Sequence, residues 1–302
     1  MEPERPLADW LWWSVVTITT VGYGDLTPSQ TPGRLIGILL MFSGIGVLSM
    51  FTATVASFFV ELQVRKDRGL KALTFENHFI ICEWCSRAHA IYDELRADPR
   101  SADKPIVLLA DSIDQKPVDD DDLHFIYGDV SEDSLRRAGV MTASTIIVLG
   151  DDRLEPASRD AKVVLTTLTT EHLNPNAYTV VELVREENAR HCERAHADEI
   201  IIGDEFSSRL IASAAVDHGI SKVMSELLST RYGNDLKKIP LPDDMADRPF
   251  LDVLGDMKRL NSCTTLAVMR GDQVFTNPES EFRAQVGDFL IIVAGPEGRR
   301  PA

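Results

Sequence analysis

Hydrophobic residues are concentrated near the start of the chain, and the pattern changes after residue 62. The segment from Leu35 to Leu62 holds about 28 residues and carries no charge before Glu61. At about 1.5 Å of rise per residue, a helix of this length crosses a bilayer core of roughly 30 Å. Upstream, residues 9–18 begin with Asp9, a suitable N-cap, and continue with an aromatic run. The pattern predicts a short apolar helix followed by a membrane-spanning helix.

Short apolar runs alternate with helical patterns between residues 78 and 202. Runs of this length, rich in Ile, Val and Leu, are typical of strands buried on both faces of a sheet. Strands that alternate with helices at this spacing predict a parallel, doubly wound sheet. The expected strands are 78–82, 106–111, 123–127, 145–149, 178–183 and 199–202, and the expected helices are 87–97, 134–138, 157–171 and 186–195.

The last third of the chain has a different pattern. Residues 217–230 predict a helical crossover, a natural element for dimer formation. Beyond Pro240 and Pro242, short strands are expected at 264–269, 273–275 and 289–293, with a hairpin signal at Gly271-Asp272. The predicted domains are 1–33 (short helix and glycine-rich loop), 34–64 (membrane helix), 65–77 (linker), 78–216 (α/β lobe), 217–239 (helical crossover) and 240–302 (small α+β lobe).

Composition and charge indicate which partners the chain can bind and on which side of the membrane its C-terminal part lies. The 302 residues carry a formal net charge of −16, which argues against nucleic acid because phosphate binding needs clustered Lys and Arg. Four cysteines in a chain of this length do not indicate a disulfide framework. Arg65, Lys66 and Arg68 directly follow the apolar span, so the positive-inside rule places the C-terminal part in the cytoplasm.

The segment Thr20-Val21-Gly22-Tyr23-Gly24-Asp25 is the most specific motif of the chain. Alternating glycines make a poor helix and a poor strand, but they permit positive φ at alternate residues. The segment resembles the selectivity filter of potassium channels, in which four copies around an axis turn their carbonyl oxygens inward and replace the water shell of K⁺. A glycine-rich turn is the alternative. Downstream, Gly44 and Gly46 interrupt the apolar span and suit either a gating hinge or close helix packing.

The turn after the first predicted strand is a candidate nucleotide site. A dinucleotide turn has the pattern G-x-G-x-x-G/A, whereas Glu83 and Cys85 stand at the two leading glycine positions and only Ala88 fits. A carboxylate there repels phosphate, but Asp111 ends the second strand where an acidic residue holds a ribose. Nucleotide binding through a degenerate site is therefore one hypothesis. Its candidate residues are Glu83, Trp84, Cys85, Arg87, Asp111 and Asp129.

A divalent cation is the second candidate ligand. Asp151 and Asp152 follow the fourth predicted strand, and Glu182 lies at the end of the fifth. The ends of parallel strands converge, and carboxylate oxygens suit Ca²⁺. The alternative is solvated acid on an acidic surface. We therefore name Asp151 and Glu182 as candidate metal ligands.

These motifs together resemble the prokaryotic potassium channels with a cytosolic RCK (regulator of K⁺ conductance) domain, from about Leu7 to Ala294. The resemblance implies a mixed fold: an α-helical pore segment with pore helix, filter and inner helix, an α/β Rossmann-like RCK domain of the TrkA-N type, and a small α+β TrkA-C lobe. It implies a multi-pass protein of the cell membrane, a homotetramer with a ring of RCK domains, K⁺ as the permeant ion, and Ca²⁺ or an NAD- or ADP-type nucleotide as regulator. In calcium-gated members an Asp and two Glu line the regulatory site; Asp151 and Glu182 match two of these positions, and Val184 replaces the third.

The leading hypothesis is therefore a ligand-gated potassium channel and not an enzyme. The resemblance also implies an outer membrane helix, but only eight residues precede the predicted pore helix, so we expect a fragment or a missed upstream start. One alternative is a regulatory subunit of a potassium transporter, built from RCK lobes alone. The other is an NAD-dependent oxidoreductase, which would need an intact phosphate turn and a catalytic acid or base.

Overall fold

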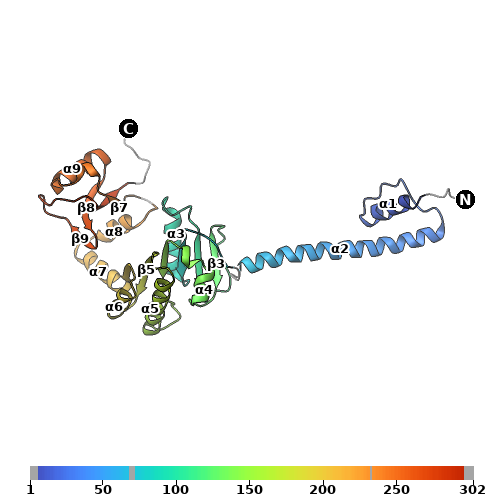
Figure 1. Ribbon diagram of the computed structural model, residues 1–302, viewed down its shortest axis with the longest axis horizontal. Helices are drawn as coiled ribbons and strands as arrows, with labels where there is room; N and C mark the ends of the chain where they lie inside the picture. The colour runs from blue at the N-terminus through green and yellow to red at the C-terminus, as the bar shows by residue number, and fades with distance from the viewer. Residues whose placement is uncertain (1–5, 68–71, 232, 296–302) are drawn as a thin grey trace. The chain divides into compact units, whose positions relative to one another are not determined.

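The computed structural model describes residues 6–67, 72–231 and 233–295, and it divides the chain into two compact units (Figure 1). The first unit comprises Met1–Leu70 and the second Lys71–Ala302. Within the predicted linker 65–77, residues 68–71 lie outside the described part of the chain, and these include one of the three cationic residues named above.

The first unit consists of two helices joined by the glycine-rich loop. Helix α1 spans Leu7–Ile18 and helix α2 spans Thr31–Asp67. Pro6, and not Asp9, occupies the N-cap position of α1, so the helix begins three residues earlier than an N-cap at Asp9 would place it. Small residues let α1 lie close against α2: a Cβ added at Gly37 would come within 3.3 Å of the Trp13 ring.

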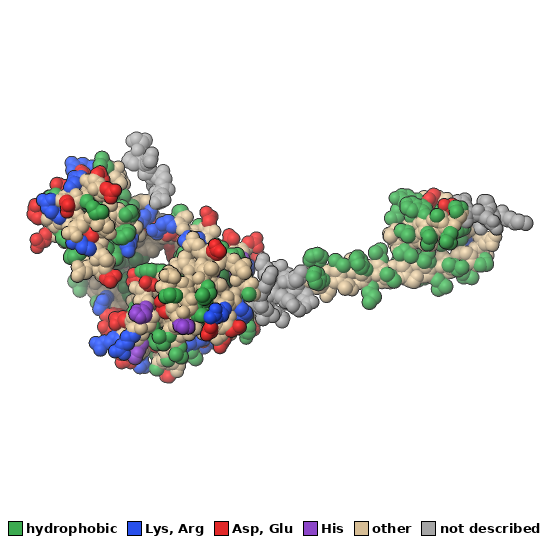
Figure 2. Space-filling model, in the orientation of Figure 1, with side chains coloured by type: hydrophobic (Ala, Val, Ile, Leu, Met, Phe, Trp, Pro, Cys, Tyr) green, Lys and Arg blue, Asp and Glu red, His purple; other side chains and the backbone are tan. Residues whose placement is uncertain are grey.

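Helix α2 presents apolar side chains to its surroundings. Its segment Thr31–Val60 has a mean hydropathy of 2.2, and only 11% of its most apolar window is buried. Hydrophobic side chains accordingly cover the surface of this unit in Figure 2. Among the described residues, α2 is the one helix long and apolar enough to cross a membrane. Burial in a lipid core accounts for such a surface, whereas a soluble helix of this length carries a polar face.

The second unit begins with a six-stranded parallel sheet, as the alternating pattern predicted. Its strands lie in the order β3-β2-β1-β4-β5-β6, so the chain reverses direction across the sheet between β1 and β4. The strands are β1 Phe79–Cys82, β2 Ile106–Ala110, β3 Leu123–Tyr127, β4 Thr145–Val148, β5 Tyr178–Leu183 and β6 Glu199–Ile202. The connecting helices are α3 Ser86–Ala97, α4 Glu132–Arg137, α5 Pro156–Leu173 and α6 Ala189–Arg194, with short 3₁₀ turns at Val140–Thr142 and Glu186–Asn188.

Two apolar clusters cover the faces of this sheet. Alternate residues of β1 belong to different clusters: Ile80 and Cys82 to one, Phe79 and Ile81 to the other. All four are buried, which explains why the strand has a continuous apolar run instead of alternation. Ala88 is fully buried at the start of α3, where a small residue lets the helix approach the sheet closely.

The C-terminal part contains three elements that the sequence pattern did not predict. These are helix α7 (Gly203–Val216), strand β7 (Asp235–Pro240), which begins after the expected crossover helix 217–230, and helix α9 (Phe250–Asn261). The crossover itself is helix α8, Ile220–Leu228. Strands β8 Thr264–Arg270, β9 Gln273–Thr276 and β10 Phe289–Ala294 complete an antiparallel sheet of order β7-β10-β8-β9. A 3₁₀ turn at Asp243–Met245 lies between β7 and α9.

Pairing with β10 explains why the polar segment at β7 is a strand. Residues Asp235 to Pro240 pair antiparallel with Ala294 to Phe289. Their own sequence, DLKKIP, has weak strand propensity, so the neighbouring apolar strand supplies the reason for the conformation.

Candidate functional site

The glycine-rich loop has the backbone alternation that a carbonyl-lined filter needs. φ is +62° at Thr20, +57° at Gly22 and +74° at Gly24, whereas Val21 and Tyr23 between them have ordinary values. Positive φ in a β-branched residue such as Thr20 is a genuine outlier, so the surrounding chain must impose it. The amides of Val21 and Gly22 both donate to the carbonyl of Val16, at 3.0 and 3.2 Å, and fix the loop to the C-terminal end of α1.

Aromatic side chains of α1 support the far end of this loop. The indole Nε1 of Trp12 donates to Asp25 Oδ2 at 3.0 Å, and the Trp12 ring stacks on Tyr23 with a centroid distance of 6.0 Å. These contacts join α1 to Tyr23 and Asp25 of the predicted filter. Tyr23 remains 68% exposed within the single chain.

The two candidate hinge glycines have different surroundings. A Cβ at Gly44 would lie 2.8 Å from Ile18 Cγ1 and 3.1 Å from its Cα, so this glycine permits the close contact between α2 and the end of α1. A Cβ at Gly46 would meet no atom within 4 Å. The geometry thus gives Gly44 a packing role, and the hinge role of either glycine stays a prediction.

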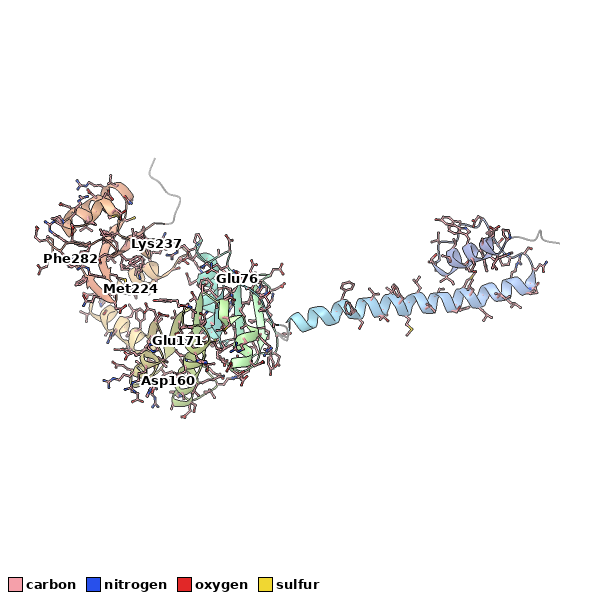
Figure 3. All side chains as sticks on the ribbon, viewed as in Figure 1. Glu76, Asp160, Glu171, Met224, Lys237 and Phe282 are labelled. Atoms are coloured by element: carbon pink, nitrogen blue, oxygen red, sulfur yellow. The ribbon has the colours of Figure 1, made fainter. Side chains whose placement is uncertain are left out.

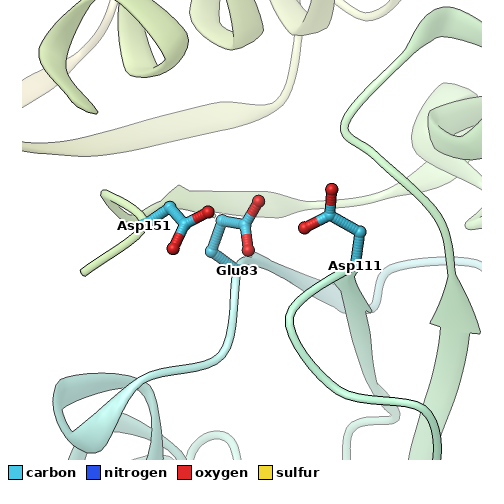
Figure 4. A group of neighbouring side chains, drawn as sticks. All are labelled: Glu83, Asp111 and Asp151. Carbon is cyan, nitrogen blue, oxygen red and sulfur yellow. The ribbon is translucent and has the colours of Figure 1, made fainter. Parts of the chain in front are cut away.

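In the second unit, the carboxyl ends of β1, β2 and β4 bring three acidic side chains together (Figure 4). One oxygen each from Glu83, Asp111 and Asp151 lies within 4.8 Å of the others. The reversal between β1 and β4 is the point where doubly wound folds bind ligands. Glu83 has a φ of +75°, so it adopts the conformation that the first glycine of a dinucleotide turn normally supplies.

Two cationic side chains pair with the acids of this cluster. Lys162 Nζ, from α5, contacts the carboxylate of Glu83 and lies 3.8 Å from Asp111 Oδ1 and 3.7 Å from Asp151 Oδ2. Arg153 bridges two of the acids, with Nη2 at 2.6 Å from Asp111 and 2.7 Å from Asp151. Hydrogen bonds from Arg153 lower the pKa of Asp151 to about 2, so this carboxylate stays ionised.

Burial has the larger effect on the pKa of Glu83, whereas pairing with acids has the larger effect on the pKa of Lys162. Burial raises the pKa of Glu83, because one ammonium group does not restore the hydration that this 98%-buried carboxylate has lost. Burial opposes the charge of Lys162 as well, but its bond to Glu83 and the charges of Asp111 and Asp151 outweigh that effect and raise its pKa. Lys162 is therefore a cation at any physiological pH.

Glu182, the other predicted metal ligand, belongs to a different set of ion pairs. It lies 2.8 Å from Arg87 and 3.6 Å from Arg159, and both arginines also contact Asp152, at 2.7 and 2.9 Å. The structure thus groups Asp151 with Glu83 and Asp111, while Glu182 is neutralised by arginines. Gly150 makes room for this arrangement, since a Cβ there would collide with Arg159.

A buried carboxylate fixes the chain directly after β5. Asp160 of α5, labelled in Figure 3, is fully buried and accepts hydrogen bonds from the amides of Val184 (2.9 Å) and Arg185 (3.0 Å) and from Asn188 Nδ2 (2.8 Å). Glu182 lies two residues before Val184. Asp160 therefore holds the strand end that presents Glu182.

The remaining candidate residues lie around the first turn or away from it. Trp84 packs against His89 with a ring distance of 5.7 Å, and Cys85 occupies the N-cap position of α3. Asp129 is exposed after β3, the edge strand, which is separated from β1 by β2. The nucleotide hypothesis named all three, and the structure places only the residues of the first turn beside the reversal point.

Of the cations at these sites, Arg87 was a candidate from the sequence, whereas Arg153, Arg159 and Lys162 were not recognised. Arg159 and Lys162 lie three residues apart in the segment 157–171, which was expected to be a helix, so they share one face of it. That helix follows the strand that ends before Asp151. The spacing was therefore a usable signal that cations would meet the predicted acids.

Comparison with known proteins agrees with this two-part organisation. Residues 4–61 match the family described as "Ion channel", and residues 79–203 match the TrkA-N domain. Match to an ion-channel family overturns the alternative of a transporter subunit built from RCK lobes alone. The same match contradicts the alternative of an NAD-dependent oxidoreductase.

Relatives that align with most of this chain are described as potassium channels and not as enzymes. The chain is 28% identical over 288 residues to the calcium-gated potassium channel TvoK of Thermoplasma volcanium, covering 94% of this chain and 81% of that protein. It is 29% identical over 288 residues to potassium channel protein 1 of Methanocaldococcus jannaschii, covering 92% and 82%.

Among solved structures, the human SLO3 gating ring matches 72% of this chain and 44% of its own, with a TM-score of 0.57 and 16% identity, which shows a common fold. The loop with alternating φ and the apolar α2 lie in the ion-channel match, and the doubly wound sheet lies in the TrkA-N match that follows it. The chain belongs to the potassium channels, membrane proteins in which an ion-channel pore is followed by a regulatory RCK domain of the TrkA-N type.

Proposed function

We propose that the chain forms a K⁺-selective pore lined by the carbonyl oxygens of Thr20 to Gly24 and gated by its RCK domain. The observation that carries this proposal is the alternation of positive and ordinary φ along the filter segment. Such alternation directs successive carbonyls to one side, and rings of these oxygens replace the hydration shell of K⁺. The C-terminal end of α1 points into the same loop, and its negative dipole end favours a cation.

A homotetramer in the cell membrane, with more than one membrane pass per chain, completes the pore. A single filter segment supplies one side of each oxygen ring, so a closed ring needs further copies. Val21 and Tyr23 are 54% and 68% exposed within one chain, and neighbouring copies would cover them. In the second unit, α7 and α8 bury none of their residues and expose Phe206, Ile211 and Val223, which suits assembly of the RCK domains into a ring.

The regulator that the site favours is a divalent cation such as Ca²⁺. Carboxylates from three strand ends are ligands of the kind that Ca²⁺ prefers, and the relative TvoK is described as calcium-gated. An effector opens a channel only through a difference in affinity between two shapes of the regulatory domain. In this chain, movement of the strand ends would reach the pore through residues 65–77.

An NAD- or ADP-type nucleotide is the second candidate regulator. Asp111 lies at the end of β2, where a ribose hydroxyl would meet it, and Arg87 and Arg153 offer charge for phosphates. Against this, the Glu83 carboxylate occupies the turn where a pyrophosphate would approach the backbone. We therefore favour a divalent cation over a nucleotide as the regulator.

Flux through liposomes containing the purified chain tests both parts of the proposal. We expect K⁺ to pass and Na⁺ to be excluded, and Ca²⁺ to change the K⁺ flux. Gly22→Ala forces alanine to a φ of +57° and should abolish selective flux, whereas Gly287→Ala, at a φ of +91° in the C-terminal lobe, should preserve it. Equal K⁺ and Na⁺ flux would refute the filter assignment. A flux that responds to ADP or NAD⁺ but not to Ca²⁺ would reverse the order of the two regulators.

A further inference from the structure

The ammonium group of Lys162 lies where a bound cation would lie. Its Nζ contacts the Glu83 carboxylate and is within 3.8 Å of oxygens from Asp111 and Asp151. Those three acids come from three different strand ends, and Lys162 comes from α5. Each acid presents an oxygen within 4.8 Å of the others, and Ca²⁺ ligands at 2.3–2.6 Å from a common ion have this spread.

A buried carboxylate oxygen without a hydrogen-bond donor in the described part of the chain lies in the same cluster. Glu83 is 2% exposed, and its Oε2 has no hydrogen-bond partner among the described residues. Figure 4 shows its carboxyl group between those of Asp111 and Asp151. A buried oxygen without a partner is costly, and an ammonium satisfies only the other oxygen of this group. A metal ion can bind both oxygens of one carboxylate.

Charge balance also favours exchange of Lys162 for a divalent ion. Three carboxylates carry −3, and Lys162 with Arg153 supplies +2, which leaves a net charge of −1. With a divalent ion in place of the ammonium, the sum over the acids, Arg153 and the ion is zero. The Lys162 side chain is 26% exposed and flexible, so its ammonium can move into solvent when an ion enters.

We propose that Glu83, Asp111 and Asp151 form a divalent-cation site in which Lys162 is a tethered counterion that an entering ion must displace. This site differs from the pair Asp151 and Glu182, because Glu182 lies outside the group of three oxygens and pairs with Arg87 and Arg159. Glu83 and Asp111 lie beside Asp151 instead, and Arg153 stays as a second counterion of the two aspartates. The proposal deepens the regulation by cations suggested above. It rests on that function for its effect on gating, and not for the binding of the ion.

Equilibrium dialysis of the full chain in detergent against radioactive Ca²⁺ tests the site. Lys162→Gln removes the competing charge and should raise the affinity for Ca²⁺ by roughly tenfold. The added mutation Glu83→Gln should abolish that gain. Lys162→Arg keeps the charge and should bind like the parent chain, as should Lys222→Gln, which changes an exposed lysine of α8. Unchanged affinity in folded Lys162→Gln, or a gain that survives Glu83→Gln, would overturn the proposal.

A measurement on the unmodified chain covers the case in which Lys162→Gln does not fold. Acetylation of Lys162, followed by mass spectrometry, reports whether its amine leaves the cluster. Saturating Ca²⁺ should increase labelling of Lys162 severalfold and leave Lys222 unchanged, whereas equal labelling with and without Ca²⁺ would overturn the proposal. Because neither experiment measures conduction, failure of the site and failure of the channel assignment are separate outcomes.

Discussion

Replacing Asp160 tests how the RCK lobe holds the strand end that carries Glu182. The carboxylate is fully buried and accepts three hydrogen bonds of 2.8–3.0 Å, from the amides of Val184 and Arg185 and from Asn188. Hydrogen bonds to charged acceptors contribute roughly 1.5–3 kcal/mol each in buried sites. The donors lie in a partly exposed loop, where water can replace the carboxylate, so about 1 kcal/mol each is the appropriate value. Asp160→Ala should therefore lower the free energy of unfolding by about 3 kcal/mol.

Denaturant unfolding of residues 72–302, which form a compact unit with their own cores, measures this change. Asp160→Asn keeps one acceptor oxygen and should lose about half as much. Glu186→Gln removes an exposed carboxylate from the same loop and should stay within about 0.5 kcal/mol of the parent. A loss below 1 kcal/mol for Asp160→Ala would contradict the assigned anchoring role. So would a loss for Glu186→Gln equal to that of Asp160→Ala.

Two further predictions concern packing in the pore unit and acid stability. Gly44→Ala should lower the stability of the pore unit by about 1–3 kcal/mol, because the added Cβ collides with Ile18, and it should reduce K⁺ flux. Gly46→Ala should change neither quantity, because a Cβ there meets no atom within 4 Å. Equal effects of the two variants in the flux assay would contradict this prediction. Burial lowers the pKa of His78, so the folded unit favours the neutral ring and should lose stability as pH falls below 6.5, by at most about 1.4 kcal/mol per pH unit. His78→Gln should make the melting temperature of residues 72–302 less sensitive to acid over that range, and an unchanged slope would argue against His78 as the cause.

Much of the architecture was readable from local patterns. The apolar run in α2 and the alternation of buried strands with helices depend on residues close together in the sequence, and the structure confirms both. The prediction failed at β7, because that strand is polar and owes its conformation to pairing with β10. It also missed α9, whose apolar residues Phe250, Val253 and Met257 are spaced for one buried face.

The candidate site was readable only in part. Asp111, Asp151 and Glu182 were expected at the strand ends, and they are there. Glu83 was interpreted as an obstacle to phosphate, and the structure adds that it is the buried member of an acidic cluster. Lys162 and Arg159 were not considered. Their spacing places them on one face of α5, but which acids that face meets depends on how the helix packs.

The proposed filter illustrates what adjacent residues determine by themselves. Its chemistry resides in backbone carbonyls, and the positions of Gly22 and Gly24 within six adjacent residues specify which φ values are accessible. The cluster around Glu83 depends on four segments between residues 83 and 162, and each acid is compatible with a free, metal-bound or ion-paired state until its neighbours are known. The sheet order decides which acids meet, and the packing of α5 decides that Lys162 lies among them. Charge interactions act through space and depend on distance and burial, so the tertiary structure alone determines the state of this site.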